Sequence, residues 1–200
     1  KHVYSNTEKA QLYLGAATAA FSESDFAATF HNLDKAEELD PKLPEIDHLR
    51  ALTYYRKKEM DQALRFAKKS VELKSDYSDA NNTVGKFLLD MGRGNEAVPY
   101  LKKAAADVKY GDAFKPFTNL GILYYRNGDF EQSKNYFKKA SIADANRSCV
   151  ANYYLGHLAM RDGKFKDAAQ SYDRAARRFC VSFADAHLAL GIAYQRGKQF

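Results

Sequence analysis

The sequence predicts an all-α protein, an α-solenoid built from antiparallel helix pairs. Small residues recur at nearly constant spacing, and the series consists of Gly15, Ala51, Gly85, Gly121, Gly156 and Gly191. Their separations are 36, 34, 36, 35 and 35 residues. The composition favours helix throughout, because Ala, Leu, Lys and Glu are common whereas Gly and Pro number only 11 and 4. A fixed period of this length is the signature of stacked helical repeats.

Further small residues follow this series at fixed offsets. One set lies 12 residues later, at Ala63, Ala97, Ser133 and Ala168. Another lies seven residues further on, at Ser70, Ala104, Ala140 and Ala175, with bulky residues such as Phe137 and Tyr172 in between. We expect the first small residue of each unit to lie where the two helices cross, since a larger side chain would push them beyond their usual separation of about 8–10 Å.

Glycine and aspartate mark the turns between the paired helices, for example at Gly128-Asp129 and Asp162-Gly163. A glycine after the first helix supplies the left-handed residue that ends many helices. The aspartate that follows it can cap the second helix.

These residues resemble a known family. Leu120-Gly121, Tyr124, Gly128-Asp129-Phe130, Phe137 and Ala140 are similar to the tetratricopeptide motif, whose period is about 34 residues. The resemblance implies a right-handed superhelix of antiparallel pairs and a single domain over residues 1–200. We assign the repeats to residues 8–42, 43–76, 77–111, 112–147 and 148–182, followed by a terminal unpaired helix at 183–200.

In such superhelices the first helix of each pair lines a concave groove, which predicts a peptide-binding surface. The residues expected to face it are His48, Tyr55, Arg56, Asn82, Lys86, Ile122, Tyr125, Arg126, Tyr153, His157, Met160 and Arg161. Tyr and Arg are enriched at binding hot spots. The recurring arginines also end the first helices, so capping of the helix dipole is an alternative role for them.

The predicted groove mixes apolar and basic residues, which suits an extended or helical peptide with acidic and aliphatic side chains. Asn82 and Lys86 lie one turn apart and could hold one anionic group. A full carboxylate clamp of the co-chaperone kind is not expected, because the companion Lys and Asn residues are absent from the neighbouring units.

Self-association is an alternative function. The helix at 183–200 carries Leu188, Ile192, Tyr194 and Arg196, which could dock on another copy of the chain. The other interpretation is that this helix marks a truncation boundary. A second alternative function is a regulatory adaptor that recruits an enzyme.

Catalytic chemistry is not expected. The five histidines are scattered over different units, and no phosphate-binding loop of the GK[ST] type is present, so the sequence predicts no enzyme, no cofactor and no metal site. The net charge of +6 is too mild to indicate nucleic acid. The paired lysines at 68–69, 102–103 and 138–139 are interpreted as a solvated face. Contact with a membrane is expected only indirectly or through an unseen lipid anchor.

Two cysteines, Cys149 and Cys180, bracket the fifth unit. Antiparallel helices would bring them to the same edge, where a disulfide requires Cα atoms within about 7 Å. The favoured interpretation is two partly buried free thiols.

A narrower resemblance covers the middle of the chain. Asn81-Asn82, Gly85-Lys86-Phe87-Leu88, Gly92-Arg93, Ala97, Tyr100, Ala104, Tyr110 and Asn119-Leu120-Gly121 are similar to the type IV pilus pilotins. These are bacterial outer-membrane lipoproteins that help the secretin ring to localise and assemble. The resemblance implies a cell-envelope adaptor in the bacterial periplasm or at the outer membrane, with the cytoplasm as the alternative.

Overall fold

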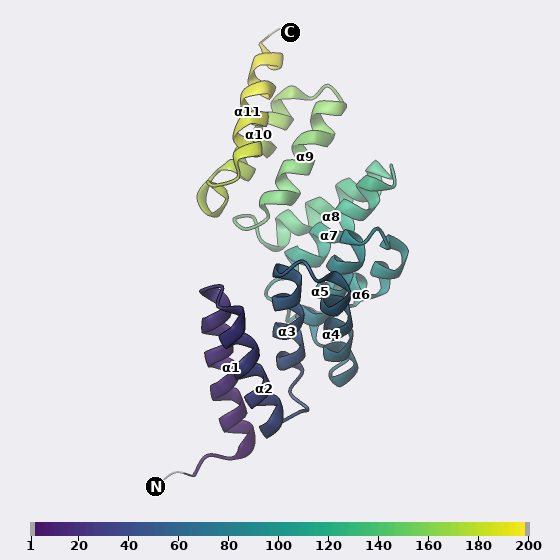
Figure 1. The fold of residues 1–200 in the computed structure, drawn as a ribbon. Helices are drawn as coiled ribbons and strands as arrows, with labels where there is room; N and C mark the ends of the chain where they lie inside the picture. The colour runs from purple at the N-terminus through teal and green to yellow at the C-terminus, as the bar shows by residue number, and fades with distance from the viewer. Residues whose placement is uncertain (1–2, 199–200) are drawn as a thin grey trace. The chain divides into compact units, whose positions relative to one another are not determined.

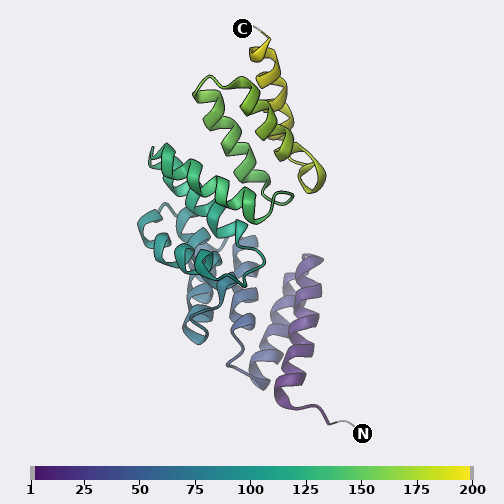
Figure 2. The same cartoon turned by 180° about the vertical axis from the view of Figure 1, so that it is seen from behind.

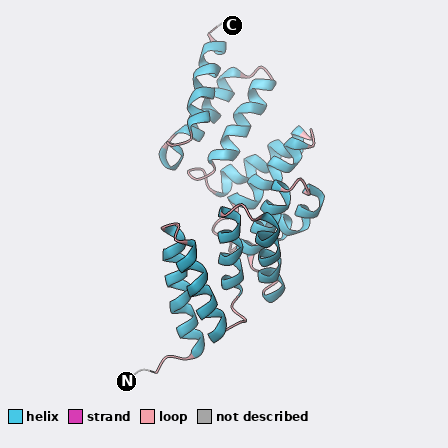
Figure 3. Ribbon diagram, viewed as in Figure 1, coloured by secondary structure: helices cyan, strands magenta, loops and turns pink. Residues whose placement is uncertain are grey.

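The computed structural model describes residues 3–198, and every regular element in that range is helical (Figures 1 and 3). Four antiparallel pairs are α1 (Asn6–Ser22) with α2 (Phe26–Leu39), α3 (Pro44–Arg56) with α4 (Met60–Leu73), α7 (Phe114–Arg126) with α8 (Phe130–Ala143), and α9 (Cys149–Arg161) with α10 (Phe165–Ala176). The remaining elements are α5 (Ser78–Asp90), α6 (Gly94–Ala106), the 3-10 helix η1 (Arg178–Cys180) and α11 (Ala184–Gly197). The all-α fold of paired helices predicted from the period is confirmed.

The chain divides into two compact units, residues 1–100 and 101–200. Unit 1 holds α1 to α5 and the start of α6, and unit 2 holds the end of α6 and α7 to α11; Figure 2 shows the same helices from behind. Each pair falls within one predicted repeat, except that α1 begins two residues before residue 8. The single domain over residues 1–200 stays a prediction.

Two turns of unit 2 contain the predicted glycine, and one of them also has the predicted aspartate cap; α10 instead follows Lys164, which makes no capping hydrogen bond through its side chain. Gly128 and Gly163 adopt positive φ angles of 78° and 71° directly after α7 and α9. Such a residue has left-handed backbone geometry, which glycine adopts without a steric penalty. Asp129 then caps α8, because its side chain accepts a hydrogen bond from the Gln132 amide at 3.1 Å.

Glycine at the helix crossing is confirmed in two pairs of unit 2. A Cβ placed on Gly121 would lie 2.5 Å from the Phe137 ring, and one placed on Gly156 would lie 2.5 Å from the Tyr172 ring. Both rings are buried, so they fill the space that the missing side chain leaves. The same expectation is wrong at Gly15, where a Cβ would meet no atom within 4 Å.

A charged network joins three helices of unit 1. Arg50 on α3 is 7% exposed and donates hydrogen bonds at 2.7 Å to both Asp34 and Glu37 on α2. Lys69 on α4 pairs with Glu37 at 2.9 Å and with the buried Asp47 at 3.1 Å. The interpretation of Lys69 as a purely solvated charge is therefore wrong, because its ammonium group supplies an ion pair to a carboxylate that burial removes from water.

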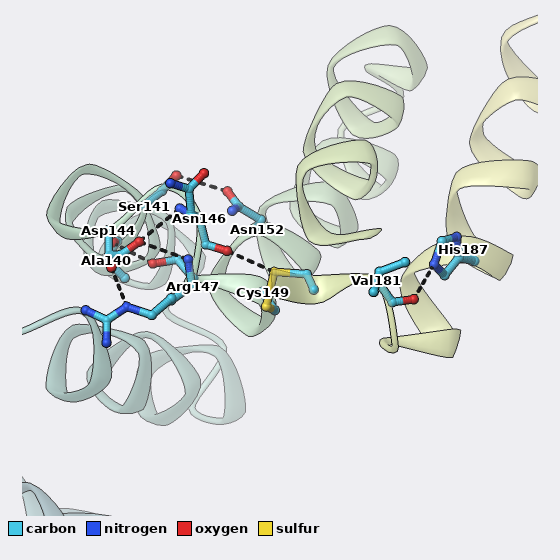
Figure 4. Close-up of a disulfide and its surroundings, with 11 residues drawn as sticks. Ala140, Ser141, Asp144, Asn146, Arg147, Cys149, Asn152, Val181 and His187 are labelled. Carbon is cyan, nitrogen blue, oxygen red and sulfur yellow. Dashed lines mark hydrogen bonds and ion pairs between the residues drawn. A yellow bond between two sulfur atoms is a disulfide. The ribbon is translucent and has the colours of Figure 1, made fainter. Parts of the chain in front are cut away.

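A disulfide closes the last complete pair of unit 2. Cys149 begins α9 and Cys180 ends η1, and their Cα atoms are 5.4 Å apart (Figure 4). The Cys180 sulfur lies 3.3 Å from the Asn146 carbonyl oxygen. The interpretation as two free thiols is wrong, because antiparallel packing and η1 bring both cysteines to one edge within bonding distance.

Candidate functional site

In unit 1 the predicted groove residues mostly bind neighbouring side chains. His48 Nε2 lies 2.8 Å from the Thr83 hydroxyl, which links α3 to α5. Tyr55 stacks on Phe87 with ring centroids 4.7 Å apart, and its hydroxyl donates to Asp90 at 3.0 Å. Lys86 pairs with the same Asp90 carboxylate. Asn82, one turn before Lys86, is half-buried. His48 and Tyr55 therefore link α3 to α5, whereas the pair of Lys86 with Asp90 lies within α5.

The recurring arginines have a role that neither sequence interpretation anticipated. Arg56 lies over the Phe26 ring at 5.3 Å, and its guanidinium donates to the Phe21 carbonyl and the Ser24 hydroxyl, both at 2.7 Å. Arg161 lies over the Phe130 ring at 3.9 Å. In both cases the arginine that ends a first helix covers the aromatic residue that begins the preceding second helix. These two arginines thus join consecutive repeats through cation–π contacts.

Residues Ile122 and Tyr125 of α7 are half-buried and pack against the core of unit 2. Tyr125 makes edge-on ring contacts with Phe130 at 5.5 Å and Tyr154 at 4.9 Å. Ile122 packs against the same cluster around Phe137. Arg126, the next residue along α7, is exposed. Tyr125 therefore contributes to the packing of unit 2.

One hollow of about 300 Å³ brings six of the predicted residues together. We call it the aromatic hollow, and its predicted members are Tyr153, His157, Met160, Leu188, Ile192 and Arg196. The first three come from α9 and the last three from α11, and Tyr172 of α10 contributes a further ring. Register explains the convergence, since residues three or four apart on a helix share one face.

Aromatic contacts hold the wall of the aromatic hollow in place. The Tyr153 ring lies 4.6 Å from His157, 5.7 Å from Tyr172 and 5.0 Å from Phe183. Phe183 lies three residues after Cys180, so the Cys149–Cys180 bond anchors the chain close to the ring that contacts Tyr153. The α11 side is more open, with Leu188 68% and Ile192 41% exposed.

Burial keeps the aromatic hollow neutral at its centre. Desolvation lowers the pKa of His157, so the imidazole is uncharged at neutral pH. Burial, followed by the neighbouring tyrosines, raises the pKa of Tyr172 to about 12. The charged side chains of its lining, Asp185 and Arg196, are both exposed. This arrangement suits an apolar side chain flanked by polar groups.

Tyr194 does not share the surface of its predicted partners. It lines a second hollow between α10 and α11, together with Phe165 and Lys198, while Leu188, Ile192 and Arg196 line the aromatic hollow. Tyr194 lies two positions from Ile192, which corresponds to about 200° around a helix. Tyr194 and the other three residues therefore lie on different faces of α11, and docking through them stays a prediction.

Sequence reasoning missed Tyr172 and Phe183 as parts of the site. Tyr172 was assigned only to packing, although its place seven residues after Phe165 in the second helix puts it beside the first helix of its own pair. Phe183 precedes α11, and no local pattern distinguishes it from a loop residue. Its contact with Tyr153 depends on how the chain turns after η1.

Within residues 3–198 no group of His, Cys, Asp or Glu side chains has the arrangement of a metal site. No helix of that range combines the length and apolar character that crossing a bilayer requires.

Comparison with known proteins identifies the class. Family models described as tetratricopeptide repeat match residues 115–146 and 153–200. Human Tetratricopeptide repeat protein 13 is 26% identical over 161 residues, which cover 78% of this chain. The chain spans 18% of the length of that human protein. Residues 115–146 and 153–200 therefore match tetratricopeptide repeats, which generally build protein–protein interaction scaffolds that lack catalytic activity.

Two solved structures share the fold of this chain. The structure of PilW, described as a widely conserved type IV pilus biogenesis factor, has a TM-score of 0.77 and 23% identity, covering 96% of this chain and 92% of PilW. PilF of Pseudomonas aeruginosa has a TM-score of 0.82 and 20% identity, covering 97% of this chain and 92% of PilF. At these identities the likeness establishes the fold.

Proposed function

We propose that the chain is a protein-binding scaffold whose aromatic hollow receives an apolar side chain from a peptide segment of a partner protein. The observation that carries the proposal is the hollow itself, in which α9 and α10 supply a fixed aromatic wall and α11 supplies exposed aliphatic residues. Arg196 at its edge would pair with an acidic residue beside the inserted side chain.

The test uses a random linear-peptide display library panned on the whole chain, followed by fluorescence anisotropy on the selected peptides. We expect Ile192→Glu to weaken binding strongly, because it places a carboxylate among apolar walls. Val181→Glu is the matched control, since Val181 is 65% exposed and lies outside the hollow. If the selected peptides bind the Ile192→Glu variant as tightly as the unaltered chain, they do not bind in the aromatic hollow.

We propose further that this scaffold serves the assembly of a structure in the bacterial cell envelope, by analogy with PilW, a type IV pilus biogenesis factor. The disulfide supports an oxidising compartment such as the bacterial periplasm, because cytosolic thiols are kept reduced. Alkylation of unreduced protein taken from the native cells tests this location. Quantitative labelling of Cys149 and Cys180 would place the chain in the cytoplasm instead.

Self-association is a second candidate function, favoured by the exposure of Leu188 and Ile192 on α11. These side chains could insert into the aromatic hollow of another copy. Alternatively, they could contact a peptide bound in their own hollow. The two candidates use the same residues and differ in whether the measured mass depends on concentration.

A further inference from the structure

Unit 2 has a further recess, lined by a different face of α9 from the aromatic hollow, which we call the basic hollow. It has a volume of about 600 Å³ and lies between α8 and α10, with Leu155 and Ala159 of α9 at its base. Leu155 and Ala159 are each two positions from Tyr153 and His157, or about 200° around the helix. The basic hollow is therefore independent of the aromatic hollow.

Four cations converge on the basic hollow against one carboxylate. Lys134 and Lys138 lie one turn apart on α8, Lys164 precedes α10, and Arg174 lies near the end of α10. Asp167 supplies the single acidic side chain of the lining. Within residues 3–198 none of the three lysines forms an ion pair. The recess thus holds excess positive charge that its own residues do not neutralise.

The apolar lining distinguishes this recess from a plain charged surface. Ile142 at the α8 end is 84% exposed, and Leu155 below it is half-buried. The neighbouring Lys139 provides a contrast, because its ammonium lies over the Tyr136 ring at 5.2 Å and it does not line the hollow. Cations around aliphatic side chains complement carboxylates placed beside an aliphatic residue.

We propose that the basic hollow binds an acidic amphipathic segment of a partner protein, separately from the peptide in the aromatic hollow. An aliphatic side chain of that segment contacts Ile142 and Leu155 while its carboxylates face Lys134, Lys138 and Lys164. The concave shape favours a protein segment over a membrane, because a bilayer presents a broad surface that does not enter a recess between two helices.

The test applies the same peptide library to the whole chain, with selected peptides measured against two charge-reversal variants. Lys134→Glu combined with Lys138→Glu reverses the charge of the basic hollow. Lys102→Glu combined with Lys103→Glu is the matched control, because both lysines are exposed on α6 and lie outside the hollow. Circular dichroism confirms that both variants remain folded.

We expect a class of peptides rich in Asp and Glu around an aliphatic residue. Their affinity should fall roughly tenfold or more in the Lys134→Glu, Lys138→Glu variant and stay unchanged in the control and in Ile192→Glu. If every selected peptide binds the Lys134→Glu, Lys138→Glu variant normally, the proposal is overturned. Sedimentation with phosphatidylglycerol vesicles that is lost in this variant would also overturn it, in favour of a membrane-binding face.

Discussion

At the residue scale, Gly156 shows how one missing side chain positions the aromatic hollow. The Tyr172 ring occupies the place of a Cβ and also contacts Tyr153 and His157. Because the ring is only 2% exposed, it has little room to move away. The helix crossing and the wall of the site therefore depend on the same contact.

Replacing Gly156 with Ala should destabilise unit 2. Overpacking of a tight contact costs about 1–3 kcal/mol, against a gain of about 1 kcal/mol in helix propensity. Gly191→Ala is the control, because it lies in an open part of α11 and should stabilise the protein by up to about 1 kcal/mol. Urea unfolding of both variants measures the difference. If both substitutions changed the free energy of unfolding equally and in the same direction, Gly156 would not lie at a tight helix crossing.

His157 should make the stability of unit 2 depend on pH. Desolvation lowers its pKa in the folded state, so the unfolded chain binds more protons in acid. The stability associated with the neutral His157 side chain is fully present above the unfolded pKa of about 6.5. It is lost as the pH falls toward the pKa of His157 in the folded state. We expect His157→Gln to flatten the fall in Tm below about pH 6.5. His31→Gln, at an exposed position, should leave the slope unchanged.

At the scale of elements, the disulfide should stabilise the α9–α10 pair. It closes a loop with a sequence separation of 31 residues, for which the chain-entropy relation gives about 3–4 kcal/mol. Cys149→Ser combined with Cys180→Ser should lower the free energy of unfolding by this amount. Adding reductant to the unaltered protein should reproduce the loss in denaturant titrations. A variant as stable as the oxidised protein would show that the bond does not constrain the pair.

Lys69 should matter far more than its sequence neighbour Lys68. Lys69→Met leaves the buried carboxylate of Asp47 without its ion pair, which costs about 3 kcal/mol, the lower end of the range for breaking a buried pair. Burial already raises the pKa of Asp47, so the loss should shrink as the pH falls and this carboxyl becomes protonated. Lys68→Met is the matched control. Thermal unfolding of both variants at neutral and acidic pH measures the difference. Equal losses of stability in the two variants would contradict the prediction.

The period of small residues was sufficient to predict the helix pairs and the turns. The same period also predicted which residues lie at two helix crossings, because Gly121 and Gly156 leave room there for bulky rings. Residue roles across repeats were less predictable. Tyr125 and Arg161 occupy the expected register, but each contacts an aromatic ring of a helix in a neighbouring repeat. Tyr125 packs on Tyr154, and Arg161 lies over Phe130. Such contacts depend on how side chains of one repeat point toward the next repeat, and the residue spacing within a single repeat does not predict this.

At the scale of the whole molecule, the net charge of +6 separates the candidate functions. Like charges oppose the association of two copies, and salt screens this repulsion. Apolar contact through Leu188 and Ile192 is insensitive to screening. Self-association should therefore strengthen as salt is added. Binding of an acidic peptide to the basic hollow should weaken, because salt screens the attraction.

Light-scattering mass over a range of protein and salt concentrations tests this contrast. If the chain self-associates, the mass should rise with both concentrations, and Leu188→Glu combined with Ile192→Glu should abolish the rise. Val181→Glu carries a similar exposed substitution in unit 2 and should have no effect. A constant monomer mass throughout would eliminate self-association. The exposed residues of α11 would then be left as the peptide-facing side of the aromatic hollow.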